Sequence, residues 1–90
     1  NTAFGKQIAG EGMIGLTRAF FMAGIPSVVA SLWKVEDNAT KVLMIEFHKK
    51  LIEGKTPDLA LRDAQIYLLR NSIYSDPIYW SSFILIGDNQ

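Results

Sequence analysis

The sequence predicts an α/β fold in which helices flank a sheet, and three observations support this prediction. Two short, almost continuous apolar runs, residues 27–33 and 80–86, are typical of strands buried on both faces. One stretch before the first run and two between the runs have the spacing of helices. Apolar residues make up 49% of the 90 residues and charged residues only 20%, which is a large apolar share for a small domain. The expected order is helix, strand, helix, helix, strand.

The first helix is expected over residues 12–23, after a glycine-punctuated loop. Gly24 follows as the residue that ends it, and Pro26 comes soon after. Apolar side chains lie almost all round this helix, with Thr17 and Arg18 as its main polar members. A helix that is apolar on every side is usually covered on every side, so we expect this one to be buried.

Residues 27–33 (SVVASLW) form the first predicted strand, and residues 36–53 form an amphipathic helix. Asp37 or Asn38 is its expected N-cap, and Gly54 follows its end. Its inner face is expected to carry four apolar residues: Leu43, Met44, Phe47 and Leu51.

Thr56 as a cap and Pro57 in the first turn predict a further helix that runs to about Arg70. Residues 71–79 are a predicted loop, and residues 80–86 (WSSFILI) are the second strand. Two apolar strands joined through helices indicate a parallel or mixed sheet, whose other strands come from outside these residues. We therefore expect the chain to be the C-terminal half of a larger α/β domain.

Composition excludes several classes of function. The chain has no cysteine, so these residues hold no disulfide, thiolate metal site or thiol nucleophile. A net charge of zero lacks the basic footprint of a nucleic-acid-binding protein. Residues 13–32, the longest apolar stretch, are interrupted by Gly24 and Pro26, and the N-terminus is unlike a signal peptide. We expect a soluble, cytoplasmic protein that binds neither nucleic acid nor a membrane.

Two candidate sites have simpler structural interpretations. Residues 10–15 (GEGMIG) fit the dinucleotide fingerprint, but residues 1–9 do not read as the strand that this motif requires, and Glu11 would repel phosphates. The favoured interpretation is that Gly12 opens the helix and Gly15 permits close packing, and nucleotide binding stays an alternative. His48 is the only histidine and lies at the margin of the apolar face of its helix, without a local catalytic partner. We predict a half-buried structural histidine, no metal site and no cofactor.

The residues Ser31, Leu32 and Trp33 lie where the first strand is expected to end, and the acids Glu36 and Asp37 follow closely. In open α/β sheets, ligands bind beyond the carboxyl ends of strands. A tryptophan there offers a flat apolar wall, and the two acids can meet a cation. Alternatively, the tryptophan belongs to the core and the acids only cap the next helix. The residues alone leave both interpretations open.

Several separate motifs occur along the chain in a fixed order. The run GEGMIGLTRAFFMAGIPSVVASLWKVEDNAT is followed by P-x-x-A-L-R-x-A-Q at Pro57–Gln65 and by P-x-x-W-x-x-F-x-L-x-G at Pro77–Gly87. This succession resembles CHAT domains, the caspase-like modules often attached to tetratricopeptide repeats in bacteria. The resemblance covers nearly all of the 90 residues.

The resemblance implies that residues 1–90 are the C-terminal portion of a single caspase-like domain. The family's catalytic cysteine would directly precede Asn1, and its histidine would lie further upstream, so no catalytic residue is expected here. By resemblance, the chain forms the S1 pocket and cleft wall of a cysteine endopeptidase. The expected substrate-binding residues are Ser31, Leu32, Trp33, Glu36 and Asp37. Acids at these positions resemble those with which separase-type relatives hold a basic P1 side chain.

Other functions stay open beside the peptidase. An inactive CHAT module that acts as a scaffold or in signalling is the first alternative, and a nucleotide-binding fragment is the second. The expected partners are a polypeptide substrate, the N-terminal half of the same domain and tetratricopeptide repeats in the same protein. The apolar surplus leads us to expect that the 90 residues self-associate when isolated.

Overall fold

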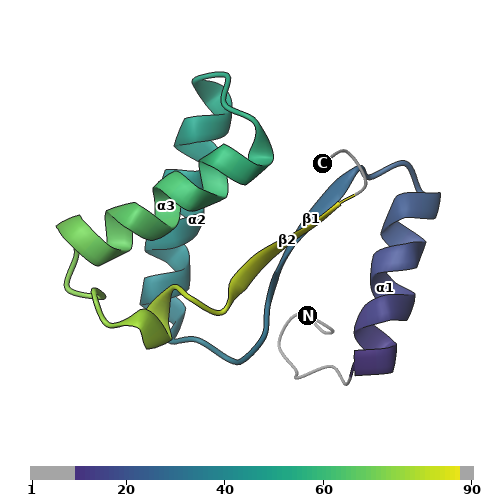
Figure 1. Cartoon of the computed structure of the whole chain (residues 1–90), viewed down its shortest axis with the longest axis horizontal. Helices are drawn as coiled ribbons and strands as arrows, with labels where there is room; N and C mark the ends of the chain where they lie inside the picture. The colour runs from purple at the N-terminus through teal and green to yellow at the C-terminus, as the bar shows by residue number, and fades with distance from the viewer. Residues whose placement is uncertain (1–9, 88–90) are drawn as a thin grey trace.

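Residues 10–87 are described by a computed structural model, which contains α1 (Gly10–Met22), β1 (Ser27–Ser31), α2 (Asp37–Ile52), α3 (Pro57–Asn71), the 3₁₀ helix η2 (Pro77–Tyr79) and β2 (Phe83–Gly87) (Figure 1). The order helix, strand, helix, helix, strand confirms the predicted α/β fold class. No helix within residues 10–87 is long and apolar enough to cross a membrane.

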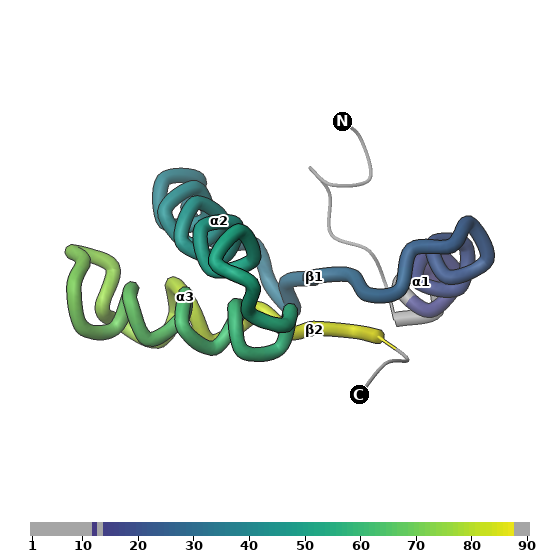
Figure 2. Tube along the Cα trace, turned by 90° about the horizontal axis from the view of Figure 1, so that it is seen from above, coloured from purple at the N-terminus to yellow at the C-terminus, as the bar shows by residue number. Residues whose placement is uncertain are grey.

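The two strands pair with each other in antiparallel orientation, with Ser27 opposite Gly87 and Ser31 opposite Phe83. Figure 2 shows them side by side although α2 and α3 separate them in the sequence. A purely parallel arrangement of these two strands was one expectation and is wrong, whereas a mixed sheet agrees with the observed pairing. No third strand joins the pair within the described residues.

The core lies between α2 and α3 and reaches the start of β2. Leu43 and Phe47 from α2 pack against Leu61 and Leu68 from α3, and Phe83 closes the end of this cluster. The inner face predicted for α2 is therefore confirmed. Full burial of one such leucine or phenylalanine contributes about 1.5–3 kcal/mol to folding.

The first helix lies at the other end of the strand pair, away from α2 and α3 (Figure 1). Ile14 is 60% exposed and Met22 is 83% exposed, so the expectation that this helix is buried is wrong within residues 10–87. Thr17 is its buried polar side chain. Gly24 has φ +90° and ends the helix as predicted, because residues other than glycine rarely adopt this conformation.

The ends of α2 and of both strands differ from the predicted ones. Glu36, not Asp37 or Asn38, is the N-cap of α2, since its Oε1 accepts a hydrogen bond from the Ala39 amide at 2.8 Å. The strands are shorter than predicted, because the chain bends after Ser31 and turns at residues 80–82. Leu32 and Trp33 therefore lie beyond the end of β1.

Three predicted features of the second half were correct in position. Thr56 directly precedes α3, although its hydroxyl donates to the Asp58 carboxylate instead of capping the helix. The turn predicted at Asp76 is the start of η2, where the Asp76 carboxylate accepts from the Ile78 amide at 3.0 Å. Gly54 has φ +98° and follows α2 as expected.

Candidate functional site

The candidate site is the segment of residues 31–37, which joins the end of β1 to the start of α2. Two hydrogen bonds, beside one between the hydroxyls of Ser31 and Ser82, hold this segment against residues 77–82. The Leu32 amide donates to the Ser82 carbonyl at 2.9 Å, and the Trp33 indole Nε1 donates to the Ile78 carbonyl at 3.1 Å. The structure thus brings all five predicted site residues to one corner of the molecule, where β1, α2 and η2 meet.

Ser31 has a structural role in this corner. Its hydroxyl contacts both the Trp33 carbonyl and the Ser82 Oγ, the latter at 2.8 Å. A carbonyl can only accept, so Ser31 donates its single proton to Trp33 and accepts a hydrogen bond from Ser82. Ser82 is fully buried. The Ser31 hydroxyl proton is therefore engaged in fixing the bend that follows β1.

The apolar residues of the segment face outward. Trp33 is 38% exposed and Leu32 is 62% exposed. The sequence left Trp33 open between core and surface, and the structure places its ring on the surface with the indole nitrogen anchored. An exposed ring held in this way is a fixed apolar wall. Val35, two residues later, is buried and anchors the segment to the core.

The two acids differ in what their carboxylates do. Glu36 uses its carboxylate to cap α2, as described above. Asp37 lies in the first turn of α2 and is exposed, and within the described residues its carboxylate has no hydrogen-bond or ion-pair partner. Of the two acids, Asp37 is the one available to a ligand.

An aromatic pair lies near the acids and was missed by sequence reasoning. The rings of Tyr74 and Tyr79 meet edge to face, with centroids 5.2 Å apart. Burial raises the pKa of Tyr74 above its usual value, and the negative charge of Glu36 raises it further. Tyr74 is therefore a neutral phenol beside the segment. Both tyrosines fall in the loop predicted over residues 71–79, and two aromatic residues within one loop were the signal that could have revealed this pair.

A second missed feature involves the family motifs themselves. Gln65, on α3, donates from its Nε2 to the Trp80 carbonyl at 2.8 Å and to the Phe83 carbonyl at 3.0 Å. Trp80 was expected in the second strand but lies in a turn, and its Nε1 donates to the Ser75 carbonyl at 3.0 Å. The motif at Pro57–Gln65 is thus hydrogen-bonded to the motif at Pro77–Gly87.

The remaining candidates give no site within residues 10–87. His48 is exposed, not half-buried as expected; its Nδ1 lies 2.8 Å from the Met44 carbonyl and its ring meets the edge of Phe47. A Cβ on Gly15 would have no neighbour within 4 Å, so the close packing expected there is absent among the described residues. The strand that the dinucleotide motif needs would fall on residues 1–9, outside the described part.

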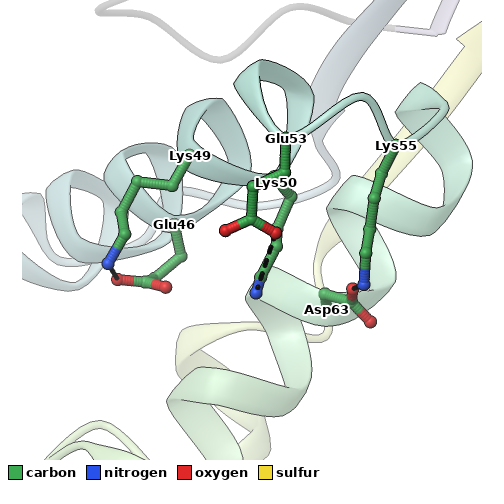
Figure 3. Close-up of polar contacts among 6 residues, drawn as sticks. All are labelled: Glu46, Lys49, Lys50, Glu53, Lys55 and Asp63. Carbon is green, nitrogen blue, oxygen red and sulfur yellow. Dashed lines mark hydrogen bonds and ion pairs between the residues drawn. The ribbon is translucent and has the colours of Figure 1, made fainter.

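Metal-ligating and ion-paired groups do not add to the site. No group of three or more histidine, cysteine or acidic side chains within residues 10–87 can hold a metal ion. The ion pairs Lys49–Glu46, Lys50–Glu53 and Lys55–Asp63 all lie on α2, on α3 and on their connection (Figure 3). The charges in these three ion pairs neutralise one another, whereas the Asp37 carboxylate has no ion-pair partner in this part of the chain.

These observations define an α/β unit with a ligand-accessible segment beyond the end of one strand. The family model of the CHAT domain matches residues 1–88, and the chain belongs to the CHAT domain family, whose members are caspase-like. The recognition made from the separate motifs is therefore confirmed.

Curated relatives agree with this family. The chain is similar to tetratricopeptide repeat protein 28 of Homo sapiens, with 35% identity over 84 residues, and of Mus musculus, with 31% identity over 83 residues. The alignments cover 93% and 92% of this chain but only 3% of each relative, so the chain spans a small part of their length. No solved structure matches the chain. Both relatives are animal proteins, and the bacterial source implied by the resemblance stays a prediction.

Proposed function

We propose that these residues form the C-terminal part of a CHAT domain and recognise the polypeptide substrate of a caspase-like cysteine endopeptidase. The nucleophilic cysteine and its histidine would lie upstream, in the other part of the same domain. The observation that carries this proposal is the exposed carboxylate of Asp37, which has no partner within residues 10–87 and lies in the same short segment as the anchored ring of Trp33. The Ser31 hydroxyl and the Glu36 carboxylate, in contrast, are engaged within the protein.

The backbone beyond β1 supports recognition of an extended peptide. The Leu32 amide points toward Ser82, so the side of the segment that faces β2 is already occupied. An extended substrate would add along the other side, where backbone pairing gives affinity and side-chain pockets give specificity. Ser31 would contribute by fixing the bend and Leu32 by an exposed apolar contact.

The substrate side chain that this site favours is basic. A lysine or arginine at P1 would lie over the face of Trp33 and donate to the Asp37 carboxylate. Glu36 would add negative charge nearby while its oxygen stays on the α2 amide. With P1 held here, the upstream cysteine thiolate would attack the scissile carbonyl to give an acyl-enzyme that water hydrolyses.

Cleavage of P1-Arg, P1-Lys and P1-Leu peptides by the full-length protein tests this proposal. We expect Asp37→Ala to lower kcat/KM for the two basic peptides by about 10- to 100-fold, because a hydrogen bond to a charged group is worth about 1.5–3 kcal/mol. The P1-Leu peptide should be unaffected. Asp58→Ala is the matched control, since Asp58 is also an exposed acid in the first turn of a helix. An equal loss on all three peptides, or no loss, would contradict the proposed role of Asp37.

The relatives also support a second part of the proposal, namely that tetratricopeptide repeats belong to the same polypeptide. The alternative of an inactive CHAT scaffold is distinguished by the residue before Asn1 and by an upstream histidine. A scaffold would lack one of these groups and would bind the basic peptides without cleaving them.

A further inference from the structure

We infer that Gln65 is a positioning residue that fixes the candidate site from α3, through the turn of residues 80–83. This inference rests on the proposed function only where it concerns substrate; its geometric part stands on hydrogen bonds within the described chain.

The first step is the contact between Gln65 and the turn. One side-chain amide group uses both of its protons, on the Trp80 carbonyl at 2.8 Å and on the Phe83 carbonyl at 3.0 Å. These carbonyls belong to the two ends of the turn. The turn's own bond, from the Phe83 amide to the Trp80 carbonyl, is long at 3.5 Å. Distances near 2.9 Å mark good N–H···O bonds, so the Gln65 amide holds the turn more firmly than its own backbone does.

The second step is the contact between the turn and the candidate site. Ser82 lies inside the turn, is fully buried, and touches the site at two points. Its carbonyl accepts from the Leu32 amide at 2.9 Å, and its hydroxyl donates to Ser31 at 2.8 Å, as the proton count above requires. Ser31 in turn donates to the Trp33 carbonyl. Moving Ser82 therefore moves the backbone on both sides of Leu32.

The two steps form one path of hydrogen bonds from α3 to the substrate-facing segment. Gln65 is only half-buried, and its neighbours Ala64 and Leu68 carry the helix packing. Removing the Gln65 donors would therefore leave the core intact while the turn loses its brace. Because the path ends on backbone atoms, the effect should reach every substrate, whatever its P1 side chain.

Hydrogen exchange of the full-length protein tests the geometric part. In Gln65→Met, which keeps the length of the side chain and removes both donors, we expect the Leu32 amide to exchange about tenfold faster, as the loss of a typical hydrogen bond would give. Exchange in the middle of α2, around Leu43, should not change. Arg62→Met is the control, because Arg62 is an exposed long side chain on the same helix. Unchanged exchange at Leu32 would overturn the inference, even for a protein that cleaves nothing.

Peptide cleavage tests the functional part. We expect Gln65→Met to raise KM about five- to tenfold for P1-Arg and P1-Leu peptides alike, with kcat unchanged. Ser82→Ala should give a similar rise, and the double variant should lose less than the sum of the two, because both act on one path. Additive losses, or an unchanged KM, would overturn the role of Gln65. Failure of the proposed function is a different result: Asp37→Ala would then lower cleavage of all three peptides equally or not at all, while the exchange result at Leu32 would stand.

Discussion

Apolar side chains are buried at one end of the molecule and exposed at the other. Between α2 and α3, Leu43 and Leu68 are fully buried in a continuous core. On α1, at the other end of the strand pair, Ile14 and Met22 are as apolar but lie mostly exposed. The sequence marks both sets as buried, and the difference is only whether another part of these 90 residues covers them. An apolar helix face indicates that something must cover it, but it does not indicate that the same 90 residues do so.

The candidate site, residues 31–37, lies at the α2–α3 end of the strand pair. It follows β1, whose residues are all half-buried, yet its anchors belong to the α2–α3 side: Val35 is in the core and Glu36 caps α2. The segment of residues 31–37 is therefore fixed by the well-packed end of the molecule. Variants that weaken one end without touching the other can test this division.

The largest effect is expected from a core deletion. Leu68→Ala should lower the free energy of unfolding by about 2–5 kcal/mol, because it removes buried methyl groups and leaves a cavity. Met22→Ala, on the exposed surface of α1, should change it by less than about 0.5 kcal/mol within this packing. Chemical denaturation of the full-length protein measures both. A large effect of Met22→Ala there would mean that another part of the protein covers α1 and would remove the contrast.

Two glycines give a smaller effect of opposite sign at the two ends. Gly54 has φ +98° after α2, so Gly54→Ala should destabilise the protein by about 1 kcal/mol. Gly15 lies within α1, and a Cβ there meets nothing within 4 Å, so Gly15→Ala should stabilise this helix by about 0.5–1 kcal/mol. The unfolding free energies of both variants check the pair. A loss of stability in Gly15→Ala would indicate that something covers this face of α1 in the full-length protein.

Sequence predicted the parts of the fold that depend on interactions between residues close in the chain, and it failed where the interactions join distant residues. The helices α2 and α3 were predicted because their signals are local, namely apolar spacing, Pro57 at a first turn and Gly54 at an end. The antiparallel register of Ser31 with Phe83 was not, because strand pairing joins residues that the chain separates. Trp80 fits a strand by composition alone, and it lies in a turn that a glutamine from another helix braces.

The structure separates the roles of the five candidate residues, and sequence did not predict these roles. All five residues lie together, yet sequence could not separate Glu36 from Asp37, because adjacent acids share composition and helix position. Which carboxylate caps the helix depends on the backbone angles at the end of the loop, and Glu36 has those of a cap. Likewise, the Ser31 hydroxyl is engaged only because the buried Ser82 lies opposite it.

The smallest effect concerns acid pH and should be confined to the α2–α3 end, which holds all three ion pairs of the described residues. The hydrogen bond from Lys55, at 2.5 Å, lowers the pKa of Asp63 below its usual value. A carboxyl whose pKa is lower in the folded state stabilises that state above its unfolded pKa of about 4, and this stability is lost as pH falls through the folded pKa. Because both side chains are partly exposed, the effect should be small and weakened by salt.

Asp63→Asn tests this assignment through the denaturation midpoint between about pH 6 and pH 3. The variant should be slightly less stable at pH 6 and should lose less stability on acidification than the unaltered protein. Asp58, whose pKa the Thr56 hydroxyl lowers, is the control, since Asp58→Asn removes a similar exposed carboxyl without breaking an ion pair. The salt dependence should therefore disappear in Asp63→Asn and persist in Asp58→Asn. If the salt dependence instead persisted in Asp63→Asn and disappeared in Asp58→Asn, the Lys55–Asp63 ion pair would not be its source.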